Sequence, residues 1–187
     1  LNLEGIGLKL NEKKAIEINS QFKTNIESIY AIGDVVPGTM LAHTAEEEGV
    51  GCVEFNNGEK RHINYDIIPA IVYTNPEVAS VGKTESQLKD AKVDYKVGKF
   101  PFMANGRALT TSSPEGFVKI LADSKSDEIL GAHIIGHDAG QLIAEIVTTM
   151  EFGGSSEDIA RICHAHPTTS EAVKEAAMNI DGRAIHI

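Results

Sequence analysis

Two side chains near the end of the chain have types and a spacing suited to proton transfer. His166 lies five residues before Glu171 in the segment His-Ala-His-Pro-Thr-Thr-Ser-Glu. An imidazole titrates near neutrality, and a carboxylate bonded to one ring nitrogen fixes its tautomer and stabilises its cation. Pro167 keeps His166 out of helical geometry, so Glu171 would lie in the first turn of a following helix, beside the chain that leads into it. The pair is therefore a candidate acid–base site.

The same segment has a purely structural interpretation. Thr168 to Glu171 matches a capping box, in which Glu171 binds free backbone N–H groups at a helix start and His166 is an ordinary loop residue. Spacing alone favours this second interpretation, because capping boxes are common and catalytic pairs are rare. The two interpretations can also coexist, with Thr168 capping the helix while Glu171 turns to His166.

A metal site is a weaker possibility for the same region. Structural zinc sites bring their ligands as spaced pairs such as CxxC, and the two cysteines of this chain form no such pair. We therefore expect no metal centre. The side chains that could contribute to one are Cys163, His164, His166, His133 and His137.

A third set of residues surrounds the turn at Gly33-Asp34. An apolar run, 29–32, precedes it, and Met40, Leu41, Ala42 and His43 follow at the expected start of a helix. A carboxylate after a buried strand can bind sugar-like hydroxyls, and free N–H groups at a helix start can stabilise an electron-rich ring edge. The alternatives are a simple turn at Asp34 and core packing of Met40 and Leu41. No GxGxxG segment is present, so the glycine turn that seats a dinucleotide pyrophosphate is missing.

Length and composition limit the classes of protein to consider. The 187 residues suffice for one domain and part of another, and 42% hydrophobic with 24% charged residues is typical of soluble globular proteins. A net charge of −10 argues against a protein that binds nucleic-acid backbones. Two unpaired cysteines fit a reducing compartment, such as a cytoplasm or a mitochondrial matrix. The chain begins Leu-Asn-Leu-Glu, with no Met or signal-like segment, and we expect a trimmed product.

The elements that must position these residues follow from periodicity and turn signals. Residues 1–33 indicate short strands and turns, including 15–18 and 29–32, and 42–56 indicates a helix with Glu46, Glu47 and Glu48 near its start. We place a domain boundary near residue 64. Beyond it we expect strands at 67–73, 78–81, 94–99, 117–122 and 129–135, and helices after the capping box 84–87 and at 142–150, 156–162 and 168–179. This order predicts an α+β domain with helices on a mainly antiparallel sheet.

Four segments, in this order, resemble the flavin-dependent pyridine nucleotide-disulfide oxidoreductases. They are 29–35 (IYAIGDV), 41–49 (LAHTAEEEG), 71–82 (IVYTNPEVASVG) and 164–168 (HAHPT). The Leu-Ala-His and His-Ala-His-Pro-Thr forms are more similar to the dihydrolipoamide dehydrogenases than to the glutathione reductases. The resemblance extends over essentially the whole chain.

The resemblance implies roles for individual residues. His166 would take a proton from a dihydrolipoamide thiol, with Glu171 orienting it. Asp34 would bind a ribityl hydroxyl of FAD, and the backbone from Met40 to His43 would approach the pyrimidine edge of the flavin. Thr169 stands where the lipoamide enzymes usually carry Leu, which changes the packing beside the base but leaves both acid–base residues.

The resemblance also implies an organisation. Residues 1–64 would be the C-terminal remnant of an FAD/NAD-binding region, and 65–187 an interface domain through which a homodimer forms. The full-length enzyme would oxidise dihydrolipoamide on the lipoyl domains of 2-oxoacid dehydrogenase or glycine-cleavage complexes and reduce NAD+ to NADH, with His166 acting on the partner's flavin and disulfide. Its two redox cysteines and glycine-rich motifs lie outside this sequence, so we expect the isolated chain to be inactive.

Two other functions stay open. The chain could act as an autonomous dimerisation module in which the His–Glu pair is idle. Alternatively, the full-length protein could be a disulfide reductase of the glutathione reductase type.

Overall fold

The computed structural model describes residues 2–59 and 63–187. They form two compact units, Leu1–Asn64 and Tyr65–Ile187, which are described separately below. Among the described residues, no helix is both long enough and apolar enough to cross a membrane.

The first unit contains one long helix, α1 (Ala42–Asn56), and two short 3-10 turns, η1 (Glu4–Ile6) and η2 (Gly33–Val35). The helix matches the predicted range, but no acidic residue lies in its first turn. The strands predicted within 1–33 are wrong: the described part of this unit holds only isolated bridges, Leu10 to Ile16 and Lys23 to Tyr30. These segments find no neighbour to pair with over several residues, so their backbone groups bond across turns instead.

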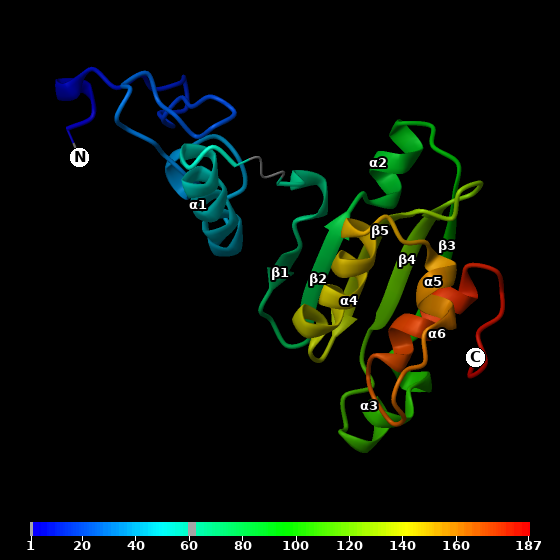
Figure 1. The fold of residues 1–187 in the computed structure, drawn as a ribbon. Helices are drawn as coiled ribbons and strands as arrows, with labels where there is room; N and C mark the ends of the chain where they lie inside the picture. Colours follow the sequence, from blue (N-terminus) through cyan, green and yellow to red (C-terminus); the bar gives the residue numbers. More distant parts are fainter. Residues whose placement is uncertain (1, 60–62) are drawn as a thin grey trace. The chain divides into compact units, whose positions relative to one another are not determined.

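The second unit is built on a five-stranded antiparallel sheet with the strand order β1-β2-β5-β4-β3 (Figure 1). The strands are β1 (Ala70–Val72), β2 (Glu77–Gly82), β3 (Tyr95–Pro101), β4 (Phe117–Asp123) and β5 (Ile129–Gly136). The helices are α2 (Glu85–Asp90), α3 (Gly106–Thr110), α4 (Ala139–Glu151), α5 (Ser156–Arg161) and α6 (Glu171–Asn179), with 3-10 turns η3 (Tyr65–Ile67) and η4 (Phe102–Ala104).

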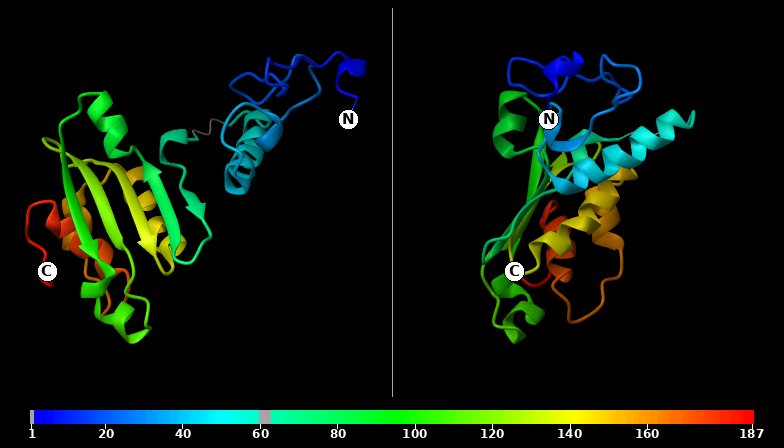
Figure 2. Two further views of the ribbon diagram at one scale, coloured as in Figure 1. Left: turned by 180° about the vertical axis from the view of Figure 1, so that it is seen from behind. Right: turned by 90° about the vertical axis from the view of Figure 1, so that its left-hand side faces the viewer.

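Helices α4, α5 and α6 cover one face of this sheet (Figure 2). Alternate residues of each strand face them, as in Val118 and Ile120 of β4, which are fully buried. Helix α4 buries the predicted stripe, including Ile143 and Ile146, against β2 and β5. The arrangement confirms the α+β fold expected from the sequence.

Several predicted elements have different bounds in the structure. The first predicted strand, 67–73, is reduced to β1, because Pro69 has no N–H to donate and residues 65–67 form a 3-10 turn. The last helix begins at Glu171 instead of residue 168. Strand β3 extends to Pro101, two residues beyond the predicted 94–99, because β4 pairs with it along its whole length.

Helix α6 lies unusually close to the sheet. At Gly98 of β3, an added Cβ atom would lie 2.0 Å from the backbone oxygen of Ala176 and 2.9 Å from the nitrogen of Ile180. Only a residue without a side chain permits this approach. Gly98 therefore sets the depth at which α6, and Glu171 at its start, sit on the sheet.

Candidate functional site

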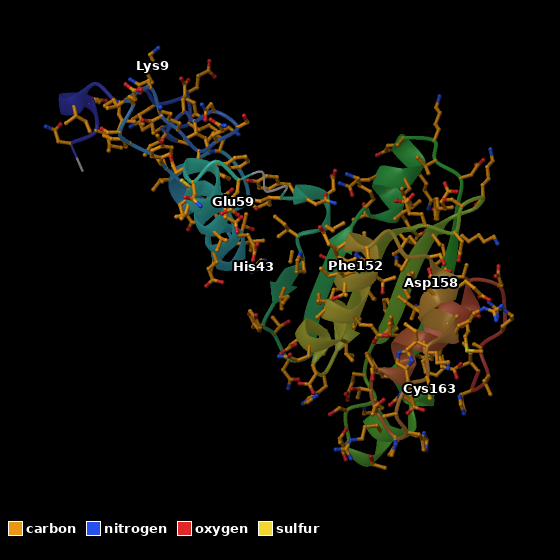
Figure 3. All side chains as sticks on the ribbon, in the orientation of Figure 1. Lys9, His43, Glu59, Phe152, Asp158 and Cys163 are labelled. Atoms are coloured by element: carbon orange, nitrogen blue, oxygen red, sulfur yellow. The ribbon has the colours of Figure 1, made fainter. Side chains whose placement is uncertain are left out.

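The loop that joins α5 to α6 carries the candidate acid–base pair; Cys163, labelled in Figure 3, lies in this loop. Nδ1 of His166 lies 3.0 Å from Oε1 of Glu171, within hydrogen-bond distance. The His166 side chain is 77% exposed and that of Glu171 is 25% exposed. The structure thus brings the two predicted side chains together and leaves the rest of the imidazole open.

Glu171 binds the backbone at the same time. Its second oxygen, Oε2, accepts a hydrogen bond from the N–H of Thr168 at 2.9 Å. The reciprocal half of the capping box is missing, because the Thr168 hydroxyl donates to the oxygen of Ala165 at 2.7 Å and Ser170 occupies the N-cap position without a side-chain bond. The prediction that Thr168 caps the helix is therefore wrong. Glu171 serves the backbone and the imidazole with separate oxygens.

The electrostatic surroundings favour the ionised form of Glu171. Partial burial raises the pKa of this carboxyl, but the hydrogen bonds from Thr168 and His166, together with the charges of His166 and His186, outweigh burial and lower the pKa below its ordinary value. An ionised carboxylate only accepts hydrogen bonds, so Nδ1 of His166 must donate. The remaining nitrogen, Nε2, then carries the lone pair that can take up a proton.

The loop around His166 is held by several further bonds. Nδ2 of Asn105 donates to the oxygen of Thr168 at 3.0 Å, and Nζ of Lys174 donates to the oxygen of Ile162 at 2.9 Å. His164, whose side chain is only 6% exposed, contacts Glu145 of α4 through Nε2 at 2.6 Å. Sequence reasoning missed Glu145, because no short-range pattern links it to a histidine 19 residues later.

The histidines considered as metal ligands are bound elsewhere. His133 lies 3.2 Å from the oxygen of Lys83 through Nε2, and His137 lies 3.0 Å from a carboxylate oxygen of Asp138. Across residues 2–59 and 63–187, no three His, Cys, Asp or Glu side chains gather as a metal site would require. Cys52 and Cys163 are free thiols.

In the first unit, Asp34 and Met40 line one cavity of about 500 Å³, together with residues of the turn between them. Met40 is 76% exposed, so the core-packing alternative for it is wrong. Leu41 is the N-cap of α1 and offers no side-chain cap, and Ala42 and His43 form the first turn of the helix.

A buried glutamate of α1 holds the turn that carries Asp34. Oε2 of Glu48 accepts the N–H of Gly33 at 2.7 Å, and Gly33 has a φ of +66°. A Cβ atom at Gly33 would lie 2.7 Å from that of Ala45. Sequence reasoning placed Glu48 among the acids favoured by the helix dipole, whereas its bond instead fixes η2 against α1.

Comparison with known protein families adds the decisive observation. Residues 68–177 match the family described as "Pyridine nucleotide-disulphide oxidoreductase, dimerisation domain", and residues 1–49 match "Pyridine nucleotide-disulphide oxidoreductase". The chain belongs to the pyridine nucleotide-disulphide oxidoreductase family. The two matches follow each other in the chain, as the resemblance of the four segments implies.

Within this family, the chain is similar to the dihydrolipoyl dehydrogenases, which confirms the second part of the resemblance. It is 56% identical over its whole length to the mitochondrial enzyme of Pisum sativum and 54% identical to that of Sus scrofa. It is also 57% identical over 178 residues to a leghemoglobin reductase of Glycine max. The chain spans 37% of the length of the first two relatives and 34% of the third.

Two solved structures have the same fold. LpdA from Mycobacterium tuberculosis superposes with a TM-score of 0.87 at 27% identity, covering 95% of this chain and 39% of that one. The HOCl-induced flavoprotein disulfide reductase RclA from Escherichia coli superposes with a TM-score of 0.88 at 25% identity, covering 94% of this chain and 41% of that one.

Proposed function

We propose that this chain is the C-terminal part of a dihydrolipoyl dehydrogenase and supplies its acid–base pair. The observation that carries the proposal is the contact of His166 with Glu171, which leaves an exposed Nε2 as the proton acceptor. The sequence identity of 56% and 54% to two dihydrolipoyl dehydrogenases, over all 187 residues, supports dihydrolipoamide as the substrate.

The proposed reaction oxidises a dithiol to a disulfide while NAD+ is reduced to NADH. A thiolate, not a thiol, attacks a disulfide sulfur, so the substrate thiol must lose its proton first. Nε2 of His166 accepts that proton, and the imidazolium that forms is stabilised by the carboxylate of Glu171 at Nδ1. The attacking thiolate forms a mixed disulfide with a redox-active disulfide of the enzyme, which lies outside this chain. The second substrate thiolate then completes the substrate disulfide and leaves the enzyme as a dithiol.

The residues of the first unit suit one edge of a flavin. FAD, when bound, carries the electron pair from the enzyme dithiol to NAD+. Asp34 offers an exposed carboxylate to a ribityl hydroxyl, and the backbone from Met40 to His43, at the start of α1, would approach the pyrimidine edge of the ring. Met40 and Leu41 flank this helix start. These residues form one wall only, so the chain alone would neither hold FAD tightly nor turn over.

The partners follow from the same proposal. The second unit would form a homodimer, and the substrate dithiol would be carried by lipoyl domains of 2-oxoacid dehydrogenase or glycine-cleavage complexes. The relatives of Pisum sativum and Sus scrofa carry the word mitochondrial in their names, which supports the mitochondrial matrix in a eukaryote and leaves the cytoplasm for a bacterium.

A substrate comparison with the full-length enzyme tests the proposal. We expect rapid NAD+ reduction with dihydrolipoamide and little NAD(P)H oxidation with glutathione disulfide. The 187-residue chain alone, assayed in parallel, should give neither reaction. Preference for glutathione disulfide would instead identify a glutathione reductase-like enzyme, and activity with neither substrate would leave the second unit as a dimerisation module.

A further inference from the structure

A second histidine–glutamate pair lies under the loop that carries His166, and the proposed mechanism does not use it. Nε2 of His164 lies 2.6 Å from Oε1 of Glu145, and Nδ1 of the same ring lies 3.0 Å from the oxygen of Ile162. With its side chain 6% exposed, His164 is nearly buried, whereas His166, two residues later, is 77% exposed. The two imidazoles therefore have different surroundings: one is packed beneath the surface and the other faces solvent.

The hydrogen-bond roles of His164 follow from its partners. A carbonyl oxygen can only accept, so Nδ1 donates to Ile162. The contact between Nε2 and Glu145 then needs one further proton, which either the ring or the carboxyl carries. Both forms are attractive: one is a partly buried ion pair and the other a neutral hydrogen bond.

We propose that the Glu145–His164 pair is a positioning device that fixes the His166 loop on α4. Glu145 lies on the second turn of α4, a helix whose opposite side is buried against the sheet, so the packing of the core fixes its position. His164 transfers that fixed position to the loop backbone two residues before His166. Glu171 holds the imidazole from the other side, through α6. The His166 loop is thus attached to α4 through His164 and to α6 through Glu171.

This proposal rests on the proposed function, because its consequence is a correctly placed base. Removing Glu145 leaves the nearly buried Nε2 of His164 without this partner and frees the loop. A displacement of about 1 Å at the base is enough to cost a large factor in rate. The loss should appear in the thiol step alone, and not in steps that bypass His166.

The test uses variants of the full-length enzyme. Glu145→Ala should lower kcat for dihydrolipoamide about tenfold, while FAD content, KM for NAD+ and the oxidation of NADH by an artificial electron acceptor stay unchanged. Glu145→Gln should restore kcat to within about threefold, because its amide can donate to Nε2 of a neutral ring that still donates from Nδ1. Glu151→Ala, an exposed residue further along the same helix, is the matched control and should behave as the parent.

Four outcomes decide the proposal. Full dihydrolipoamide turnover in Glu145→Ala overturns it, and so does a parallel loss of the artificial-acceptor activity, which would mean a general structural defect. A kcat of Glu145→Gln no higher than that of Glu145→Ala also overturns it.

If Glu145→Ala does not fold, His164→Asn replaces it as the test. This variant keeps the bond to Ile162 but lacks the reach to Glu145. It should show the same selective loss, and normal turnover of this variant contradicts the proposal. A separate His166→Ala variant with normal turnover would instead remove the proposed function itself.

Discussion

Glu171 divides its two oxygens between the imidazole of His166 and the backbone of Thr168, and this division explains why one residue satisfied two interpretations of the sequence. A capping role alone would leave His166 free to rotate. A catalytic role alone would leave the N–H of Thr168 without this partner. Because both bonds form, the carboxylate is held in place by the backbone and in turn fixes the tautomer of the His166 imidazole.

Replacing Glu171 by Gln removes the negative charge of the side chain and keeps its shape, so it tests whether the charge is needed. The amide can accept from Nδ1 of His166 only by turning its NH2 group toward the N–H of Thr168, so one of the two bonds is lost in either orientation. We expect kcat for dihydrolipoamide to fall about ten- to hundredfold. Steady-state kinetics of the full-length enzyme measure the change. Glu128→Gln, at an exposed position on the sheet hairpin, is the control, and equal kinetics in the two variants would contradict this role of Glu171.

At the scale of elements, the position of α6 depends on the missing side chain of Gly98. Gly98→Ala would force the new Cβ against the backbone of Ala176 and displace the helix that carries Glu171. We expect a loss of about 3 kcal/mol or more in the free energy of unfolding, at the upper end for overpacked cores. Urea denaturation of the 187-residue chain measures it. Gly106→Ala, where no atom lies within 4 Å of the added Cβ, should change stability little, and equal effects at both positions would disprove the argument.

Elements with a local sequence pattern were predicted correctly, and those that depend on distant partners were not. The hairpin of β4 and β5, the capping box of Thr84 and Gln87 and the apolar stripe of α4 were all predicted, because each has a local pattern that its own packing reinforces. The short strands within 1–33 were wrongly predicted, since a strand also needs a neighbour and apolar alternation does not supply one. The contact of Glu145 with His164 has no local pattern at all.

The candidate site was predictable in part for the same reason. The pairing of His166 with Glu171 is local, five residues apart, and could be foreseen as one of two alternatives. The bond from Gly33 to Glu48 spans 15 residues and depends on how η2 packs on α1, so only the folded chain reveals it. Spacing alone favours the capping alternative, and the family membership supports our proposal that the pair also acts as acid and base.

For the whole molecule, the description of residues 68–177 as a dimerisation domain predicts association. Sedimentation velocity of the 187-residue chain over a concentration series should show a monomer–dimer equilibrium that shifts toward the dimer as concentration rises. A single monomeric species at the highest concentration would contradict an autonomous interface. Species larger than a dimer would indicate non-specific association through exposed apolar surface instead.

The most direct test of the account is the rate of dihydrolipoamide oxidation in a His166→Ala variant of the full-length enzyme. Loss of a positioned general base should lower kcat by about two to four orders of magnitude, with FAD still bound and the oxidation of NADH by an artificial acceptor preserved. His137→Ala, which removes an imidazole bound to Asp138 outside the acid–base pair, is the matched control and should retain turnover. Near-normal turnover in His166→Ala would contradict the assignment of this histidine as the base.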